Sequence, residues 1–190
     1  MKEVVFHYVK KCTLVVANKT TLLHGKDNTL LLMLKYTTYD IVFQEFPDEV
    51  TLAVNLSRCP NACPGCHSAA LQGDIGEVLT EERLLALADS YEGSITCVAL
   101  MGGDNDPQEV LRLLAAVRKR SGGSLRTGWY SGRTRVPETQ QMVAALSYLK
   151  LGPYVAKLGP LNSPETNQRF YRVEPDGTLT DLTHRFWRKG

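Results

Sequence analysis

Short apolar runs alternate along this chain with segments in which apolar residues recur at helical spacing. The runs are four to eight residues long, which suits strands buried on both faces. They predict strands over residues 51–56, 94–101, 125–130 and 148–151. Because strands that alternate with amphipathic helices form parallel sheets with right-handed crossovers, the pattern predicts an α/β fold.

Three helices are predicted between these strands, and each has a recognisable start. Thr80 precedes two glutamates, as an N-cap precedes acids that favour the positive end of the helix dipole. Asp106 precedes a proline, which is favoured at the first helical position, and Pro137 opens the third helix. The last two helices are expected to end near residues 120 and 146.

Chain length limits how far the sheet can close. A complete eightfold βα barrel needs about 250 residues, whereas this chain has 190. We therefore expect a partial, open βα barrel with a mostly parallel sheet. Residues 169–173 and 178–182 flank an Asp-Gly turn and predict an additional C-terminal hairpin. Residues 1–32 keep no clean period and are interpreted as an N-terminal extension before a domain over residues 33–190.

Composition and charge argue against nucleic acid and membranes as binding partners. Lys and Arg total 22 against 20 Asp and Glu, so the net charge of +2 creates no strong field for nucleic acid. The longest apolar stretches are too short for a secretory segment or a membrane span. We expect a cytoplasmic protein that acts on a small molecule or on another protein.

The five cysteines are unevenly spread. In a reducing compartment they are not expected to form a disulfide framework. Cys12 and Cys97 stand alone and are expected to be small buried hydrophobic residues. Cys59, Cys63 and Cys66 lie within eight positions, and this clustering predicts a metal site.

The clustered cysteines follow the first predicted strand in a C-x3-C-x2-C spacing, on a loop rich in proline and glycine. Three thiolates on a four-iron cluster leave one iron open. An open iron can bind the amino and carboxylate groups of S-adenosylmethionine. The alternative is structural zinc with His67 as the fourth ligand, although the ligands of such sites usually come as two separated pairs.

Polar residues and glycines stand at the ends of the later predicted strands. Ligands gather at the carboxyl ends of strands in parallel sheets, so these residues are expected near the cysteine loop. A tight turn, packing and solvation are the alternative roles. The candidates for binding the cofactor are Gly102, Gly103, Asp104, Tyr130, Ser131 and Lys150.

The cysteine spacing and the strand before it resemble the radical S-adenosylmethionine superfamily. Over residues 39–186 the chain is more closely similar to the activating proteins of anaerobic ribonucleoside-triphosphate reductase, in their short form with Cys-Pro-Asn-x-Cys-x-Gly-Cys-His. The similar segments are residues 40–45, 59–68, 101–104, 129–133, 148–159 and 163–173.

This resemblance implies a [4Fe-4S] cluster on the three clustered cysteines, with S-adenosylmethionine as the second cofactor. It implies a fold of the radical S-adenosylmethionine type, and a glycyl radical generated on the large subunit of the reductase. The reductant would be a flavodoxin or a ferredoxin. It also implies that the Gly-Gly-Asp segment binds the methionine amino group, with Asp104 in the place of a glutamate.

Two alternatives to this activity remain open on the sequence. The chain can activate another glycyl-radical enzyme or act on a small molecule by the same radical chemistry, since nothing in the cysteine loop names the substrate. It can also be a zinc-binding module without catalysis.

The chain departs from the family pattern at two places. Most of the superfamily has an aromatic residue before the third cysteine, where it packs on the adenine, but this chain has Gly65. The adenine contacts are therefore expected from other residues. The usual start of the family aligns near Met33, which leads to the hypothesis that translation begins there.

Overall fold

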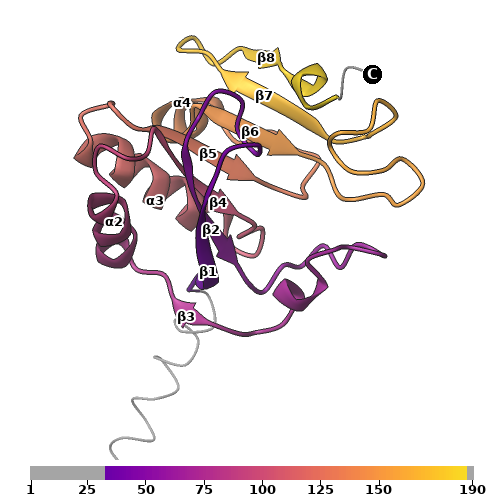
Figure 1. Ribbon diagram of the computed structural model, residues 1–190, viewed down its shortest axis with the longest axis horizontal. Helices are drawn as coiled ribbons and strands as arrows, with labels where there is room; N and C mark the ends of the chain where they lie inside the picture. Colours follow the sequence, from indigo (N-terminus) through magenta and orange to yellow (C-terminus); the bar gives the residue numbers. More distant parts are fainter. Residues whose placement is uncertain (1–32, 188–190) are drawn as a thin grey trace, which may run out of the picture. The chain divides into compact units, whose positions relative to one another are not determined.

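The structure is a computed structural model that describes residues 33–187. An eight-stranded sheet forms its centre, with the strand order β3-β1-β2-β4-β5-β6-β7-β8 (Figure 1). The predictions about residues 1–32, including the fate of Cys12, lie outside the described residues. No described helix is both long enough and apolar enough to cross a membrane.

The sheet is mixed. The strands are β1 (Lys35–Val42), β2 (Thr51–Leu56), β3 (Glu77–Val78), β4 (Cys97–Met101), β5 (Arg126–Tyr130), β6 (Tyr148–Leu151), β7 (Arg169–Val173) and β8 (Leu179–Asp181). The central strands β2, β4, β5 and β6 are parallel, whereas every pairing outside them is antiparallel. The sheet is not closed into a barrel by hydrogen bonds among the described strands, because β3 and β8 end it on opposite edges.

The prediction of a mostly parallel sheet is therefore wrong in one respect. The α/β alternation is confirmed in the centre, but β1 joins β2 through a short loop and so must run antiparallel to it. The sequence pattern does not predict β1 or β3. The hairpin of β7 and β8 is confirmed, with Tyr171 opposite Asp181.

The predicted helices are all present: α2 (Glu81–Ser90), α3 (Pro107–Arg120) and α4 (Thr139–Ala145), with short 3-10 helices η1 (Ala69–Gln72) and η2 (Thr183–Phe186). Thr80 caps α2, since its side chain accepts a hydrogen bond from the Arg83 N–H at 3.2 Å. Asp106 caps α3 in the same way. The predicted start of α4 is two residues early, because the Glu138 carboxylate accepts hydrogen bonds from two backbone N–H groups and makes Glu138 the N-cap.

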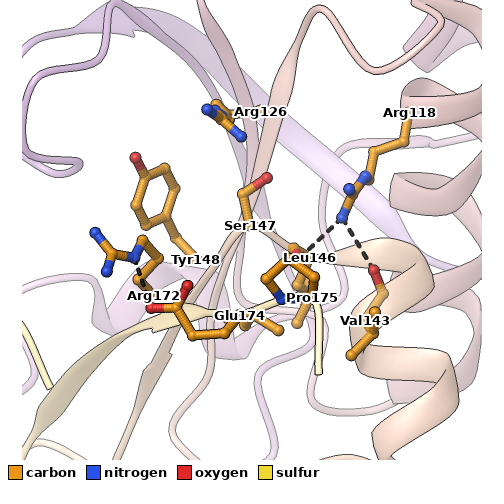
Figure 2. A pocket seen from close by; sticks show the side chains of 10 residues that line it. Arg118, Arg126, Val143, Leu146, Ser147, Tyr148, Arg172, Glu174 and Pro175 are labelled. Carbon is orange, nitrogen blue, oxygen red and sulfur yellow. Dashed lines mark hydrogen bonds and ion pairs between the residues drawn. The ribbon is translucent and has the colours of Figure 1, made fainter. Parts of the chain in front are cut away.

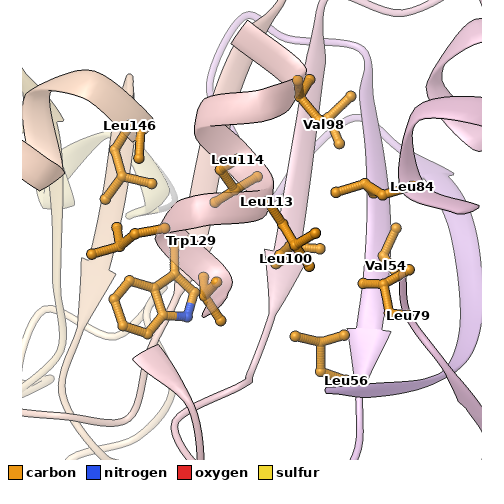
Figure 3. Close-up of a cluster of buried hydrophobic side chains, with 14 of the residues drawn as sticks. Val54, Leu56, Leu79, Leu84, Val98, Leu100, Leu113, Leu114, Trp129 and Leu146 are labelled. Atoms are coloured by element: carbon orange, nitrogen blue, oxygen red, sulfur yellow. The ribbon is translucent and has the colours of Figure 1, made fainter. Parts of the chain in front are cut away.

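The three α-helices pack on one face of the sheet and form the larger core (Figure 3). Leu84 of α2, Leu113 of α3 and Leu100 of β4 are each fully buried in it. Trp129 of β5 lies in the same core, and its indole N–H donates to the Gly102 carbonyl at 2.7 Å. This core holds the central strands in place beneath the helices.

The opposite face, called the open face here, has a smaller core to which none of these three helices contributes. Phe46, from the loop between β1 and β2, is fully buried there with Phe170. A Cβ atom on Gly128 would lie 2.1 Å from the ring of Phe46, so glycine makes room for that ring. Cys97 is buried in this core as predicted, and burial raises the pKa of its thiol.

Candidate functional site

The carboxyl ends of the four parallel strands meet at one edge of the sheet. Met101 at the end of β4 pairs with Asn55 of β2 and with Tyr130 of β5, and Tyr130 pairs with Lys150 of β6. The cysteine loop follows β2, and the Gly-Gly-Asp turn follows β4. All sequence-predicted site residues therefore lie at this carboxyl edge.

Backbone hydrogen bonds hold the cysteine loop in place, and residues with positive φ allow its tight turns. The Cys59 N–H donates to the Leu71 carbonyl at 3.0 Å, and the Arg58 N–H donates to the Gly73 carbonyl at 3.0 Å. Gly65 has a φ of 75° and so suits the tight loop before the third cysteine. Cys59 and the two later cysteines are free thiols of intermediate exposure.

Asp104 is the centre of a hydrogen-bond network that joins three loops. Its carboxylate is only 6% exposed. It accepts hydrogen bonds from the Ser131 hydroxyl at 2.6 Å, the Gly132 N–H at 2.8 Å and the Asn61 side-chain amide. The same Asn61 amide donates to the Cys59 sulfur at 3.6 Å. The network therefore ties the cysteine loop to the turn after β4 and to the end of β5.

Sequence reasoning missed Asn61. Asn61 stands inside the cysteine loop, but no local pattern shows that its partner is Asp104, which is 43 positions away. A Cβ atom on Gly132 would lie 2.4 Å from the Asn61 amide nitrogen, so only glycine fits beside it. The Cys-Pro-Asn segment was the available signal for Asn61.

The two glycines of the Gly-Gly-Asp turn have structural roles. Gly102 and Gly103 have φ values of 106° and 86°, where a side chain is strained. A Cβ atom on Gly103 would lie 2.5 Å from Val110 and 2.8 Å from Leu56. The Gly102 N–H donates to the Tyr130 carbonyl at 2.9 Å. These glycines set the path of the chain into Asp104, and the Gly102 amide is engaged within the protein.

Lys150 lies at the same carboxyl edge, on β6. Its side chain is 8% exposed, and its ammonium donates to the Gly152 carbonyl at 2.8 Å. The ammonium lies 6.0 Å from the centre of the Tyr130 ring. The Tyr130 hydroxyl donates to the Glu45 carbonyl in the loop between β1 and β2. Tyr130 therefore links that loop to the carboxyl edge, and burial raises the pKa of its phenol.

The electrostatics of Lys150 show which groups surround it. Burial lowers the pKa of Lys150 to about 8. The negative charge of Asp104 opposes this shift, and so do the charges of Cys63, Cys66 and Cys59 when their thiols are ionised. Negative charge on Asp104 and on the cysteine loop therefore favours the charged form of Lys150.

Thiolates are ligands both of iron-sulfur clusters and of zinc. Among the described residues, no three His, Cys, Asp or Glu side chains form a group that could hold a single metal ion. His67 is exposed.

A cavity of about 380 Å³ opens beside the network. Asn61 and Gly132 form one wall, and Arg133, Arg135 and Pro153 contribute to the rest. Guanidinium groups bind carboxylates and phosphates through paired N–H donors. The cavity can therefore receive an anionic group next to the cysteine loop, and its two arginines were not predicted from the sequence.

A larger cavity of about 490 Å³ lies at the opposite ends of β5 and β6 (Figure 2). Arg118 and Arg172 face it but are engaged: Arg118 donates to the Val143 and Leu146 carbonyls, and Arg172 forms an ion pair with Glu174. None of the sequence-predicted site residues lines this cavity. The candidate site is therefore the carboxyl edge.

Comparisons with known proteins found no matching family model, no similar curated protein and no similar solved structure. The functional proposal therefore rests on residue chemistry, on geometry and on the sequence resemblance. The feature that distinguishes the carboxyl edge is the hydrogen-bond network that connects Cys59, Asn61, Asp104, Ser131 and Gly132.

Proposed function

We propose that this chain is a radical S-adenosylmethionine activase that generates a glycyl radical on an anaerobic ribonucleoside-triphosphate reductase. One observation carries the proposal. The loop that carries Cys59, Cys63 and Cys66 follows β2 at the carboxyl edge of the parallel strands, and the Asn61 amide joins Cys59 to the buried Asp104. Cofactor sites in α/β proteins lie at this edge.

Cys59, Cys63 and Cys66 would hold a [4Fe-4S] cluster and leave its fourth iron open. Once bound, this cluster supplies the electron that cleaves S-adenosylmethionine into methionine and a 5'-deoxyadenosyl radical, which takes a hydrogen atom from a glycine of the partner. The protein's own part is to bind, orient and exclude water. The Asp104 network holds the loop, and Arg133 and Arg135 offer positive charge beside it.

The unclosed sheet favours a polypeptide as the substrate. The described strands do not close into a barrel, and none of the three α-helices contributes to the smaller core on the second face. A partial barrel of this type leaves a route by which a loop of a partner protein can reach the carboxyl edge. Glycine is a suitable radical site in such a loop, because its Cα radical is planar, delocalised between two amides and free of a side chain.

The resemblance to the reductase activases selects the partner within this chemistry. A cytoplasmic location with a flavodoxin or ferredoxin as reductant belongs to the same proposal. Activation of a different glycyl-radical enzyme, or action on a small molecule, is the alternative that uses the same site.

The first experiment tests the cofactor. Protein purified without oxygen should be brown, with three to four irons per chain, and Cys63→Ser should lose that iron. Cys97→Ala is the matched control, because Cys97 is buried in the open-face core and should leave the iron content unchanged. A colourless protein with one zinc per chain would overturn the proposal.

The second experiment tests the reaction. The reduced protein is mixed with S-adenosylmethionine and the reductase large subunit, and electron paramagnetic resonance is recorded. A glycyl-radical doublet on the reductase is the expected result. Methionine release without any doublet would reject the reductase as partner and favour another substrate for the same chemistry.

A further inference from the structure

We infer that Asn61 and Asp104 act as a clamp that positions the Cys59 sulfur and tunes its cluster, and that Asp104 works through Asn61 instead of binding the methionine amino group. This inference rests on the proposed function. It assigns two positioning residues, of which neither is a thiol ligand. It also departs from the role that the family resemblance implies for Asp104.

The Asn61 side chain can form the clamp because its two amide hydrogens donate to two different acceptors. An amide NH2 group has two donors. One is directed at the Cys59 sulfur, 3.6 Å away, and the other at a carboxylate oxygen of Asp104. The carboxylate therefore fixes the rotamer from which the amide reaches the sulfur. Gly132 leaves room for the side chain in this position, since a Cβ atom there would be 2.4 Å from its nitrogen.

The Asp104 carboxylate is already well supplied with donors. It has about four lone-pair sites, and three are taken by Asn61, Ser131 and Gly132. The side chain is also 6% exposed. About one site is left for an incoming amino group, which would have to share the carboxylate with donors that the protein holds in place. This arrangement suits a carboxylate that organises neighbouring loops.

A hydrogen bond to a cluster sulfur changes the reduction potential. Reduction adds negative charge to the cluster and its thiolates, and an N–H donor stabilises that charge. Loss of the Asn61 donor should therefore make the cluster harder to reduce. Reductive cleavage of a sulfonium needs a low potential, so the clamp would set a potential that remains within reach of the cell's reductants.

The main test compares Asn61→Ala, Asp104→Asn and the double variant after cluster reconstitution without oxygen. The potential is measured by redox titration and the Kd for S-adenosylmethionine by equilibrium binding. We expect each single variant to lower the equilibrium constant for reduction about tenfold, which corresponds to 59 mV for one electron. The double variant should match the single variants, because residues that act as a unit are not additive. Gln72→Ala, an exposed amide on η1, is the control and should keep the wild-type potential.

The redox and binding measurements can also refute the clamp. If Asp104→Asn keeps the wild-type potential but weakens S-adenosylmethionine binding tenfold, Asp104 is a direct ligand and the clamp is refuted. Variants that lose the cluster are tested as cluster-free protein by thermal unfolding. If the clamp exists, the double variant should be no less stable to heat than Asp104→Asn alone. If the stability losses of the two single variants add in the double variant, the clamp is refuted. Wild-type protein that takes up no iron would overturn the proposed function, while the unfolding comparison still decides whether the clamp exists.

Discussion

Gly128→Ala should destabilise the protein by a steric contact with a single ring. The Cβ atom at position 128 would lie 2.1 Å from Cε1 and 2.6 Å from Cζ of Phe46. Ordinary carbon contacts are about 3.5–4.0 Å, so the ring would have to move by more than about 1 Å. It has nowhere to go, because Phe46 is fully buried with ring centres at 5.1 Å from Tyr130 and 5.6 Å from Phe170.

The expected cost follows from overpacking. Extra methyl groups in a well-packed core typically cost about 1–3 kcal/mol, and this contact is close enough to expect the upper part of that range. Removing the ring in Phe46→Ala should cost about 3–5 kcal/mol on its own. In the double variant the new methyl group occupies part of the space left by the ring. The double variant should therefore lose less stability than the sum of the two single variants.

Urea unfolding followed by circular dichroism measures these losses as shifts in the midpoint at constant slope. Gly73→Ala is the matched control. Gly73 has a φ of −70° and ψ of 160°, and its added Cβ would meet nothing closer than 3.5 Å. That change should be neutral or should stabilise the protein by about 0.4–1 kcal/mol. The predicted steric contact is refuted if Gly128→Ala is as stable as the control. It is also refuted if the stability losses of Phe46→Ala and Gly128→Ala simply add in the double variant.

Two further changes test other parts of the structure. Lys150→Met should stabilise the cluster-free protein at pH 7 by up to about 3 kcal/mol, since burial lowers the pKa of Lys150 from 10.5 to about 8. The cost of burying its charge is fully present below pH 8 and disappears as the pH rises to 10.5, so the gain should shrink in unfolding curves at pH 9.5. A larger gain at high pH would contradict this sign. Thr80→Ala removes the N-cap of α2 and should cost about 1 kcal/mol in the same assay, with no change in iron content.

The sequence by itself determined the elements whose signals are local. The strand over 148–151 and the first strand of the hairpin over 169–173 have their predicted bounds. The start and end of α3 are also as predicted, since Asp106 caps it through an interaction with a residue three positions away. The cysteine spacing also predicts a metal site from one short segment, and this stays a prediction. In each case the interacting groups are neighbours along the chain.

Tertiary structure alone decided the features that join distant segments. The strand β1 lacks a clear apolar period, and its antiparallel pairings with β2 and β3 complete one edge of the mixed sheet. Phe46 and Gly128 fit each other across 82 positions, and Asn61 meets Asp104 across 43. A local pattern records which residue types fit a helix, a strand or a turn. Which side chains then share a donor or a space depends on how the chain packs, and that is a long-range property.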